Sequence, residues 1–286
     1  MMSYVKGVSS SVLLFLNVVC VFTLMIPLAL LKLLLPLRGV RASCDRALNA
    51  LAGAWVRFNG VWMALANRTR WRVLGLEGLR RKGWYLIGSN HQSWVDILVL
   101  QKIFAGRVPM LKFFIKRELL YVPIMGLAWW ALDFPFLRRQ GGKHSLAKDM
   151  EATRKACEKF RLIPTSVLSF VEGTRFTQSK HDQQHSPYRH LLKPKVGGLA
   201  MALETMGERF ESLLDVTIIY PRGVPNFWDV LSGKLKDVVV QVRKIQIPAH
   251  LRTAPLGSDA RYREQMQSWI AQIWAEKDAA MDQALA

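Results

Sequence analysis

The sequence predicts an α/β domain, in which a mixed sheet is flanked by helices, behind an N-terminal helical segment that anchors the chain in a membrane. An uncharged apolar run at residues 12–31 predicts the anchor. Beyond residue 70, short β-branched and aromatic stretches alternate with helical patterns of ten or more residues, which predicts the α/β domain. We therefore divide the 286 residues into anchoring helices at 1–66 and the α/β domain at 67–286.

The anchor is the apolar stretch at residues 8–37, and a helix needs roughly 20 apolar residues to cross the hydrocarbon core. A secretory signal is the main alternative, but its apolar region spans about 7–15 residues and ends at a small-residue cleavage site. No convincing site of that kind follows this longer run. Pro27 leaves a re-entrant hairpin open as an alternative to a full span.

Basic residues stand at or after the end of the anchor, namely Lys32, Arg38, Arg41 and Arg46. Positive charge near a span stays on the cytoplasmic side, so we expect the α/β domain there, at the inner membrane in a bacterium. The cysteines, Cys20, Cys44 and Cys157, are scattered without metal-like spacing, which also suits a reducing compartment.

The stretch at residues 47–66 carries few charges and three aromatic side chains, Trp55, Phe58 and Trp62. It predicts a helix that lies on the membrane or packs against the anchor. An ordinary core helix would have the same pattern.

The α/β domain is predicted from its strand-like and helical stretches in order. Strands are expected at 71–77, 84–88, 109–115, 166–171, 216–220 and 238–242. Helices are expected at 94–104, 144–160, 195–210 and 261–285. The last of these has its large apolar side chains on one face, which predicts a terminal helix packed on the domain.

The net charge of +19 indicates a negatively charged partner: nucleic acid, an anionic membrane surface or a phosphorylated substrate. The excess is greatest at residues 101–150, where nine basic residues face three acidic ones. On a membrane-anchored chain this favours anionic membrane lipids, since each basic residue near such a surface contributes about 1 kcal/mol.

The stretch GSNHQSWVDI, residues 88–97, places His91 and Asp96 at a bend between a predicted strand and a predicted helix. On a continuous helix, positions five apart point about 140° away from each other. A bend lets the carboxylate reach back to one imidazole nitrogen, which leaves the other free to act as a general base. A polar strand-to-helix turn with no catalytic role would carry the same residues.

Four further stretches place cations or a chain-stopping proline near strand ends. In FVEGTRF, Gly173 lets the backbone approach a ligand and Arg175 can grip a phosphate, directly after Glu172. The others are DFPFLRR with Arg138 and Arg139, LLKPKVGG with Lys193 and Lys195, and DVTIIYPRG, whose strand is stopped by Pro221. Each of these is ordinary by itself.

Together, and in this order, these stretches resemble the glycerolipid acyltransferases, the family of 1-acylglycerol-3-phosphate acyltransferases. NHQSWVD (90–96) is similar to the family's first motif, a histidine and an aspartate separated by four residues. FLRR (136–139), FVEGTR (170–175) and the IIYP stretch that ends at residue 221 resemble the second, third and fourth motifs. The resemblance covers roughly residues 85–225 and implies the acyltransferase-like α/β fold.

This sequence departs from the family pattern at three points. The second motif lacks the usual preceding glycine, Phe176 replaces a serine after the third, and Tyr220 takes a place commonly held by a smaller residue. These departures concern the shape of the acceptor pocket more than the reaction.

The resemblance implies an O-acyltransferase that makes phosphatidic acid from a lysophospholipid acceptor, with acyl-CoA or acyl carrier protein as the acyl donor. His91 takes the proton of the acceptor hydroxyl and Asp96 orients His91. The residues implied in substrate binding are Arg139, Glu172, Gly173, Arg175, Lys193, Lys195 and Pro221. Glu172 organises its loop, Lys193 and Lys195 serve the phosphate or the coenzyme, and Pro221 shapes the acyl-donor side.

Other activities lack their signatures. The histidines of KHDQQHSPYRH stand in a polar stretch with no cysteine nearby, so we expect no metal, and acyl transfer of this kind needs no cofactor beyond the thioester co-substrate. No nucleophile elbow or P-loop is present. A second lysophospholipid or a glycolipid acceptor stays open, as does a non-catalytic, membrane-tethered nucleic-acid-binding protein, although no nucleic-acid-binding motif supports the latter.

Overall fold

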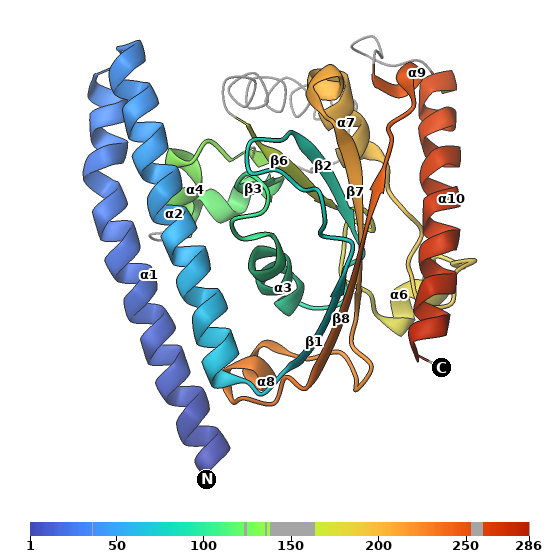
Figure 1. Ribbon diagram of the computed structural model, residues 1–286, viewed down its shortest axis with the longest axis horizontal. Helices are drawn as coiled ribbons and strands as arrows, with labels where there is room; N and C mark the ends of the chain where they lie inside the picture. The colour runs from blue at the N-terminus through green and yellow to red at the C-terminus, as the bar shows by residue number, and fades with distance from the viewer. Residues whose placement is uncertain (36, 123–124, 135, 138–163, 253–259, 286) are drawn as a thin grey trace.

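A computed structural model describes the chain except for residues 36, 123–124, 135, 138–163, 253–259 and 286 (Figure 1). Its first two elements are long helices, α1 (Met2–Leu34) and α2 (Arg38–Ala66), which lie side by side at one side of the sheet. Helix α1 continues through Pro27 and exposes most of its apolar side chains. Within the described ranges it is the one helix long and apolar enough to cross a membrane, with a mean hydropathy of 2.6 over an 18-residue stretch.

Helix α2 is amphipathic and begins at Arg38, whereas the sequence predicted a helix over residues 47–66. Its buried residues recur every three or four positions, which places them on one face: Cys44, Leu48, Ala52, Val56, Asn59, Trp62, Met63 and Ala66. The first part of this face packs on α1, and the last part joins the core beneath the sheet. Of the interpretations of residues 47–66, the structure favours a helix packed between the first helix and the α/β domain.

The α/β domain is built on a six-stranded sheet with the order β1-β8-β7-β2-β6-β3. The strands are β1 (Arg70–Leu74), β2 (Tyr85–Ser89), β3 (Leu111–Phe113), β6 (Ser166–Phe170), β7 (Ser212–Ile219) and β8 (Asp237–Ile245). All neighbours are parallel except β7 and β8, which are antiparallel, so the sheet is mixed as predicted. Strands β2 and β7 are buried along their whole length, which is typical of strands covered on both faces.

Helices cover both faces of the sheet. Helix α3 (Val95–Phe104) and the end of α2 bury one face, while α7 (Gly197–Met206) and α10 (Ala260–Leu285) bury the other. Figure 1 shows α10 on the side of the sheet opposite α1 and α2. The shorter elements are β4 (Ile115–Lys116), η1 (Arg117–Tyr121), α4 (Met125–Ala131), β5 (Phe136–Leu137), α6 (Gln178–Gln183), η2 (Gly207–Arg209), α8 (Phe227–Leu231) and α9 (Ala249–Arg252).

Two predicted strands differ from those in the structure. The strand predicted at 71–77 ends at Leu74, because Gly75 has a φ of +80° and a Cβ there would lie 1.9 Å from the carbonyl oxygen of Val242. The single strand predicted at 109–115 is divided between β3 and β4, which belong to different sheets. The helix predicted at 144–160 lies outside the described residues.

The topology gathers the polar stretches at one edge. Strands β2, β6 and β7 are mutually parallel, and Ser89 at the end of β2 pairs with Phe170 and Val216 of its two neighbours. The carboxyl ends of parallel strands meet at the same edge, where α/β proteins bind ligands. The segments that follow these strands begin with Asn90, Val171 and Tyr220.

Candidate active site

The histidine and aspartate of the first stretch meet at the start of α3. Asp96 Oδ2 lies 2.9 Å from His91 Nδ1 and also accepts the backbone N–H groups of Gln92 (2.6 Å) and Ser93 (2.9 Å). These N–H groups precede the helix and have no partner within it. The aspartate therefore holds the bend together while it contacts the imidazole, which is how positions five apart come within hydrogen-bonding distance.

The contacts of Asp96 determine which imidazole nitrogen is free. The Asp96 side chain is fully buried, and its Oδ2 accepts two backbone N–H groups, which can only donate. Oδ2 therefore acts as an acceptor at this position, and the His91 tautomer that fits it carries its proton on Nδ1. Among the described residues none forms a hydrogen bond with Nε2, which is left with its lone pair.

The imidazole is also held on its face and through its backbone. The ring of Phe170 stacks on it, with centroids 3.9 Å apart and planes 16° from parallel. The N–H of His91 donates to Glu172 Oε1 at 3.0 Å, and its carbonyl accepts from the N–H of Phe176 at 2.7 Å. The loop after β6 therefore forms hydrogen bonds with both the backbone N–H and the backbone carbonyl of His91.

Glu172 is a buried carboxyl group that joins three segments. Its Oε2 accepts the N–H of Leu192 at 3.2 Å, so one side chain links its own loop to His91 and to the LLKPK stretch. Burial raises the pKa of Glu172 to about 8, whereas the two N–H donors and the positive charge of Lys277 lower it. The family resemblance implies that Glu172 organises its loop, and its contacts join that loop to two other segments.

The glycine and two cations lie around this loop. Gly173 has a φ of +69°, and a Cβ there would lie 3.1 Å from Lys195 Cδ, so a lysine stem packs directly on the glycine. The exposed guanidinium of Arg175 lies 4.8 Å from the ring centroid of Trp94, beside the start of α3. Gly173, Arg175 and Lys195 are therefore gathered near His91 by this loop.

The remaining predicted residues are placed less directly. Lys193 is exposed, and its backbone N–H donates to Gln184 Oε1 at 3.2 Å. Pro221 is exposed and follows Tyr220 directly after β7. Arg139 lies outside the described residues.

Two residues of the site were missed as such by sequence reasoning. Asn90 donates to the carbonyl of Ile218 (2.9 Å) and accepts its N–H (2.8 Å), which ties the β2 turn to β7. The hydroxyl of Tyr220 lies 2.6 Å from Asp96 Oδ1. Asn90 belongs to the motif-like stretch and Tyr220 is a departure from the family pattern, so both were visible in the sequence, but their partners were not.

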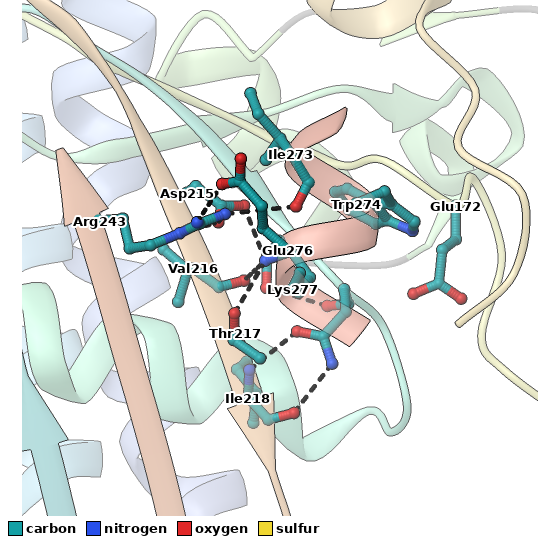
Figure 2. A network of polar contacts seen from close by, with 12 residues as sticks. Glu172, Asp215, Val216, Thr217, Ile218, Arg243, Ile273, Trp274, Glu276 and Lys277 are labelled. Carbon is teal, nitrogen blue, oxygen red and sulfur yellow. Dashed lines mark hydrogen bonds and ion pairs between the residues drawn. The ribbon is translucent and has the colours of Figure 1, made fainter. Parts of the chain in front are cut away.

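A third missed feature is a buried ionic network behind the site, shown in Figure 2. Lys277 of α10 is fully buried and lies 2.7 Å from Asp215 Oδ1, within hydrogen-bonding distance of Val216 O (2.5 Å) and Thr217 Oγ1 (3.2 Å). Arg243 of β8 pairs with the other oxygen of Asp215 at 2.8 Å. Burial lowers the pKa of Lys277, and the charge of Asp215 opposes this. The network attaches α10 to β7.

The histidine-rich stretch does not form a cluster. His181 contacts Asp182 and the carbonyl of Tyr188, and His190 contacts Asp282 on α10. Within the part of the chain that the structure describes, no three His, Cys, Asp or Glu side chains are grouped so as to hold a metal ion.

Known proteins resemble this chain in sequence and in fold. A family model described as Acyltransferase matches residues 70–222. The chain is 26% identical over 212 residues to human 1-acyl-sn-glycerol-3-phosphate acyltransferase delta and 27% identical to 1-acyl-sn-glycerol-3-phosphate acyltransferase 3 of Arabidopsis thaliana. Both alignments cover 69% of this chain and 52% of the relative, so the chain spans about half the length of these relatives.

A solved structure extends the likeness to nearly the whole chain. The crystal structure of the 1-acyl-sn-glycerophosphate (LPA) acyltransferase from Thermotoga maritima superposes with a TM-score of 0.54 and 19% sequence identity. The match covers 97% of this chain and 98% of that one. It confirms the predicted fold class.

Proposed function

Since this chain belongs to the Acyltransferase family, of the 1-acylglycerol-3-phosphate acyltransferase type, we propose that it transfers a fatty acyl group from an acyl thioester to the free hydroxyl of 1-acylglycerol-3-phosphate. The product is phosphatidic acid. The observation that carries the proposal is the 2.9 Å contact between His91 Nδ1 and Asp96 Oδ2, which leaves Nε2 as a base at the carboxyl edge of the sheet.

The reaction needs one proton to move twice. Nε2 of His91 takes the proton of the acceptor hydroxyl as its oxygen attacks the carbonyl carbon of the thioester. The tetrahedral intermediate then breaks its C–S bond, and the leaving thiolate takes the proton back from the imidazolium. Asp96 stabilises the imidazolium while it exists. General-base help of this kind contributes about 10²–10⁴-fold, and no covalent acyl-enzyme is formed.

The acceptor's phosphate is bound by cations and a close backbone. Arg175 and Lys195 are exposed beside Gly173, where the missing Cβ lets the Lys195 stem pack on the loop. We assign Lys193 and Arg139 to the same anionic groups, the phosphate or the donor's coenzyme, on the resemblance of their stretches to the family motifs. Pro221 is assigned to the acyl-donor side on the same ground.

A lipid acceptor reaches the site from a membrane, and the apolar first helix is the part of the chain that would contact one. Apolar side chains are exposed along α1 and also on the segments beside the site, where Trp94, Val224, Phe227 and Trp228 are each more than a third exposed. Helix α8 contacts the start of α1, where the rings of Tyr4 and Trp228 are 5.8 Å apart. This arrangement supports an active site that faces the bilayer. The cytoplasmic side is proposed separately, from the basic residues at the end of α1 and from the acyl-CoA and acyl carrier protein found on that side.

Acyl transfer by purified protein tests the proposal. Lysophospholipids with different head groups are each incubated with acyl-CoA or acyl carrier protein donors, and the diacyl product is measured. The substitution His91→Ala should lower the rate about 10²–10⁴-fold, whereas His250→Ala, which alters an exposed histidine of α9, should not. If the wild-type protein esterifies no lysophospholipid with either donor, the proposed function is wrong; a preference for another head group would reassign the acceptor.

Sidedness is a separate measurement. Protease digestion of α10 in sealed membrane vesicles of known orientation should occur only where the cytoplasmic face is outside. Digestion from the opposite face alone would contradict the proposed orientation.

A further inference from the structure

The hydrogen bond between Tyr220 and Asp96 is not part of the proton-transfer pair itself. The Tyr220 oxygen lies 2.6 Å from Asp96 Oδ1, while His91, Gln92 and Ser93 all contact the other oxygen, Oδ2. Tyr220 is 5% exposed and Asp96 is 0% exposed. Among the described residues, Tyr220 is the sole hydrogen-bond partner of Oδ1.

The proton in this contact belongs to the tyrosine. Burial and the adjacent negative charge of Asp96 both raise the pKa of Tyr220 well above its ordinary value. The phenol therefore keeps its proton at any pH at which the protein works, and it donates to the carboxylate. A hydrogen bond to a charged acceptor is among the stronger ones in proteins.

The position of the donor is determined by the strand that precedes it. Tyr220 comes directly after β7, whose register is fixed on one side by the paired contacts of Asn90 with Ile218. On the other side Lys277 contacts Asp215, Val216 and Thr217, as Figure 2 shows. A donor held by a clamped strand constrains its acceptor more tightly than a donor on a free loop does.

We propose that Tyr220 is a positioning residue of the acyl transfer, whose hydroxyl holds Oδ1 of Asp96 and thereby aims Oδ2 at His91 Nδ1. The inference rests on the proposed function. Rotation of a carboxylate about its last bond has only broad minima, so a donor on the second oxygen narrows the orientations that the carboxylate samples. The same donor draws negative charge toward Oδ1, which moderates how strongly Asp96 stabilises the imidazolium.

Loss of the hydroxyl therefore has two expected effects. The Asp96 carboxylate samples more orientations, so it holds the His91 ring less well; kcat falls while substrate binding is unchanged. The carboxylate also attracts the imidazolium more strongly, so the acidic limb of the rate profile moves to higher pH. The titratable groups that face Asp96 are His91 from the β2 turn, Tyr220 after β7 and Glu172 after β6, the last through the backbone of His91.

The test is Tyr220→Phe, which removes one oxygen and keeps the ring in the core beneath the sheet. The matched control is Tyr85→Phe: Tyr85 is buried in the same core, but its hydroxyl accepts the N–H of Arg80 instead. We expect kcat to fall about tenfold in Tyr220→Phe, with both KM values within about twofold of wild type. The control should keep its kcat and its pH profile.

Two further measurements separate positioning from a structural role. In a His91→Ala background, Tyr220→Phe should cause no additional loss, because the tyrosine acts through the histidine. Imidazole ¹⁵N resonances of His91, measured at a fixed pH without any turnover, should show a smaller share of the tautomer protonated at Nδ1 in Tyr220→Phe. If Tyr220→Phe fails to fold, 3-fluorotyrosine at position 220, a stronger donor that differs by one ring fluorine, should move the acidic limb of the rate profile to lower pH.

The outcomes are distinguishable. Wild-type protein without activity on any acceptor refutes the proposed function. If the wild-type protein is active, and Tyr220→Phe keeps the wild-type kcat and the wild-type share of the Nδ1 tautomer of His91, the role of Tyr220 alone is refuted. A loss confined to KM, or an equal loss in Tyr85→Phe, also refutes it.

Discussion

Replacing Lys277 by methionine tests whether the buried ion pair behind the site stabilises the fold. The lysine side chain is 0% exposed and that of Asp215 1% exposed, so neither charge is solvated by water. Methionine has a similar length and shape, which confines the perturbation to the charge and its hydrogen bonds. The substitution leaves Val216 O and Thr217 Oγ1 without the ammonium that they contact.

The expected magnitude follows from what remains around Asp215. Removing one partner of a buried ion pair costs about 3–5 kcal/mol, because the other charge stays buried. Here Asp215 keeps Arg243, whose Nε and Nη2 lie 3.0 and 2.8 Å from Oδ2. We therefore expect Lys277→Met to lower the free energy of unfolding by about 3 kcal/mol, the lower end of that range.

The loss of free energy is measured by unfolding the protein with denaturant in detergent, with the unfolded fraction detected by pulse proteolysis. Arg243→Met is the control: its side chain is 37% exposed, so solvent screens its charge and a smaller loss is expected. The double variant Asp215→Asn with Lys277→Met should lose less than the sum of its single changes, since it leaves no unpaired charge. A loss below about 1 kcal/mol for Lys277→Met, or a larger loss for Arg243→Met, would refute the reasoning.

Two more predictions concern the loop after β6. Because the folded pKa of Glu172 is about 8 and its ordinary value is 4.5, the folded protein holds this proton more tightly, so its contribution to stability is complete below about pH 4.5 and is lost as pH rises to about 8. The free energy of unfolding of the wild-type protein should therefore decrease between about pH 4.5 and pH 8 by an amount that Glu172→Gln does not show. Equal dependence of this free energy on pH in the two proteins would contradict the prediction. Arg175→Ala should raise the KM for the phosphorylated acceptor about tenfold or more through the loss of a charged hydrogen bond, whereas Arg81→Ala, another exposed arginine, should not; an unchanged KM for the acceptor would exclude Arg175 from phosphate binding.

The sequence was most informative where the signal is local. The long apolar run predicted a helix that can cross a membrane, because hydropathy and length depend on neighbouring residues alone. Alternating strand and helix patterns predicted the mixed α/β domain for the same reason. His91 and Asp96 were identified as a pair because the bend between a strand and a helix is encoded within a few residues.

Boundaries were less accurate where a distant atom decides them. Strand β1 ends at Leu74 because Gly75 turns the chain with a φ of +80°, and only glycine fits there, since a Cβ would lie 1.9 Å from the carbonyl oxygen of Val242 on a neighbouring strand. Nothing within the stretch around Gly75 indicates that neighbour.

The tertiary structure alone decided which side chains support the pair. Tyr220 reaches Asp96 across 124 positions, Glu172 joins His91 to Leu192, and Lys277 of the last helix lies beneath β7. Residue types and their spacing in one sequence indicate where helices, strands and turns form. Which distant side chains become partners depends instead on the order and register of the strands. That order follows from packing the whole core at once, so the reacting pair could be read from the chain and the residues that hold it in place could not.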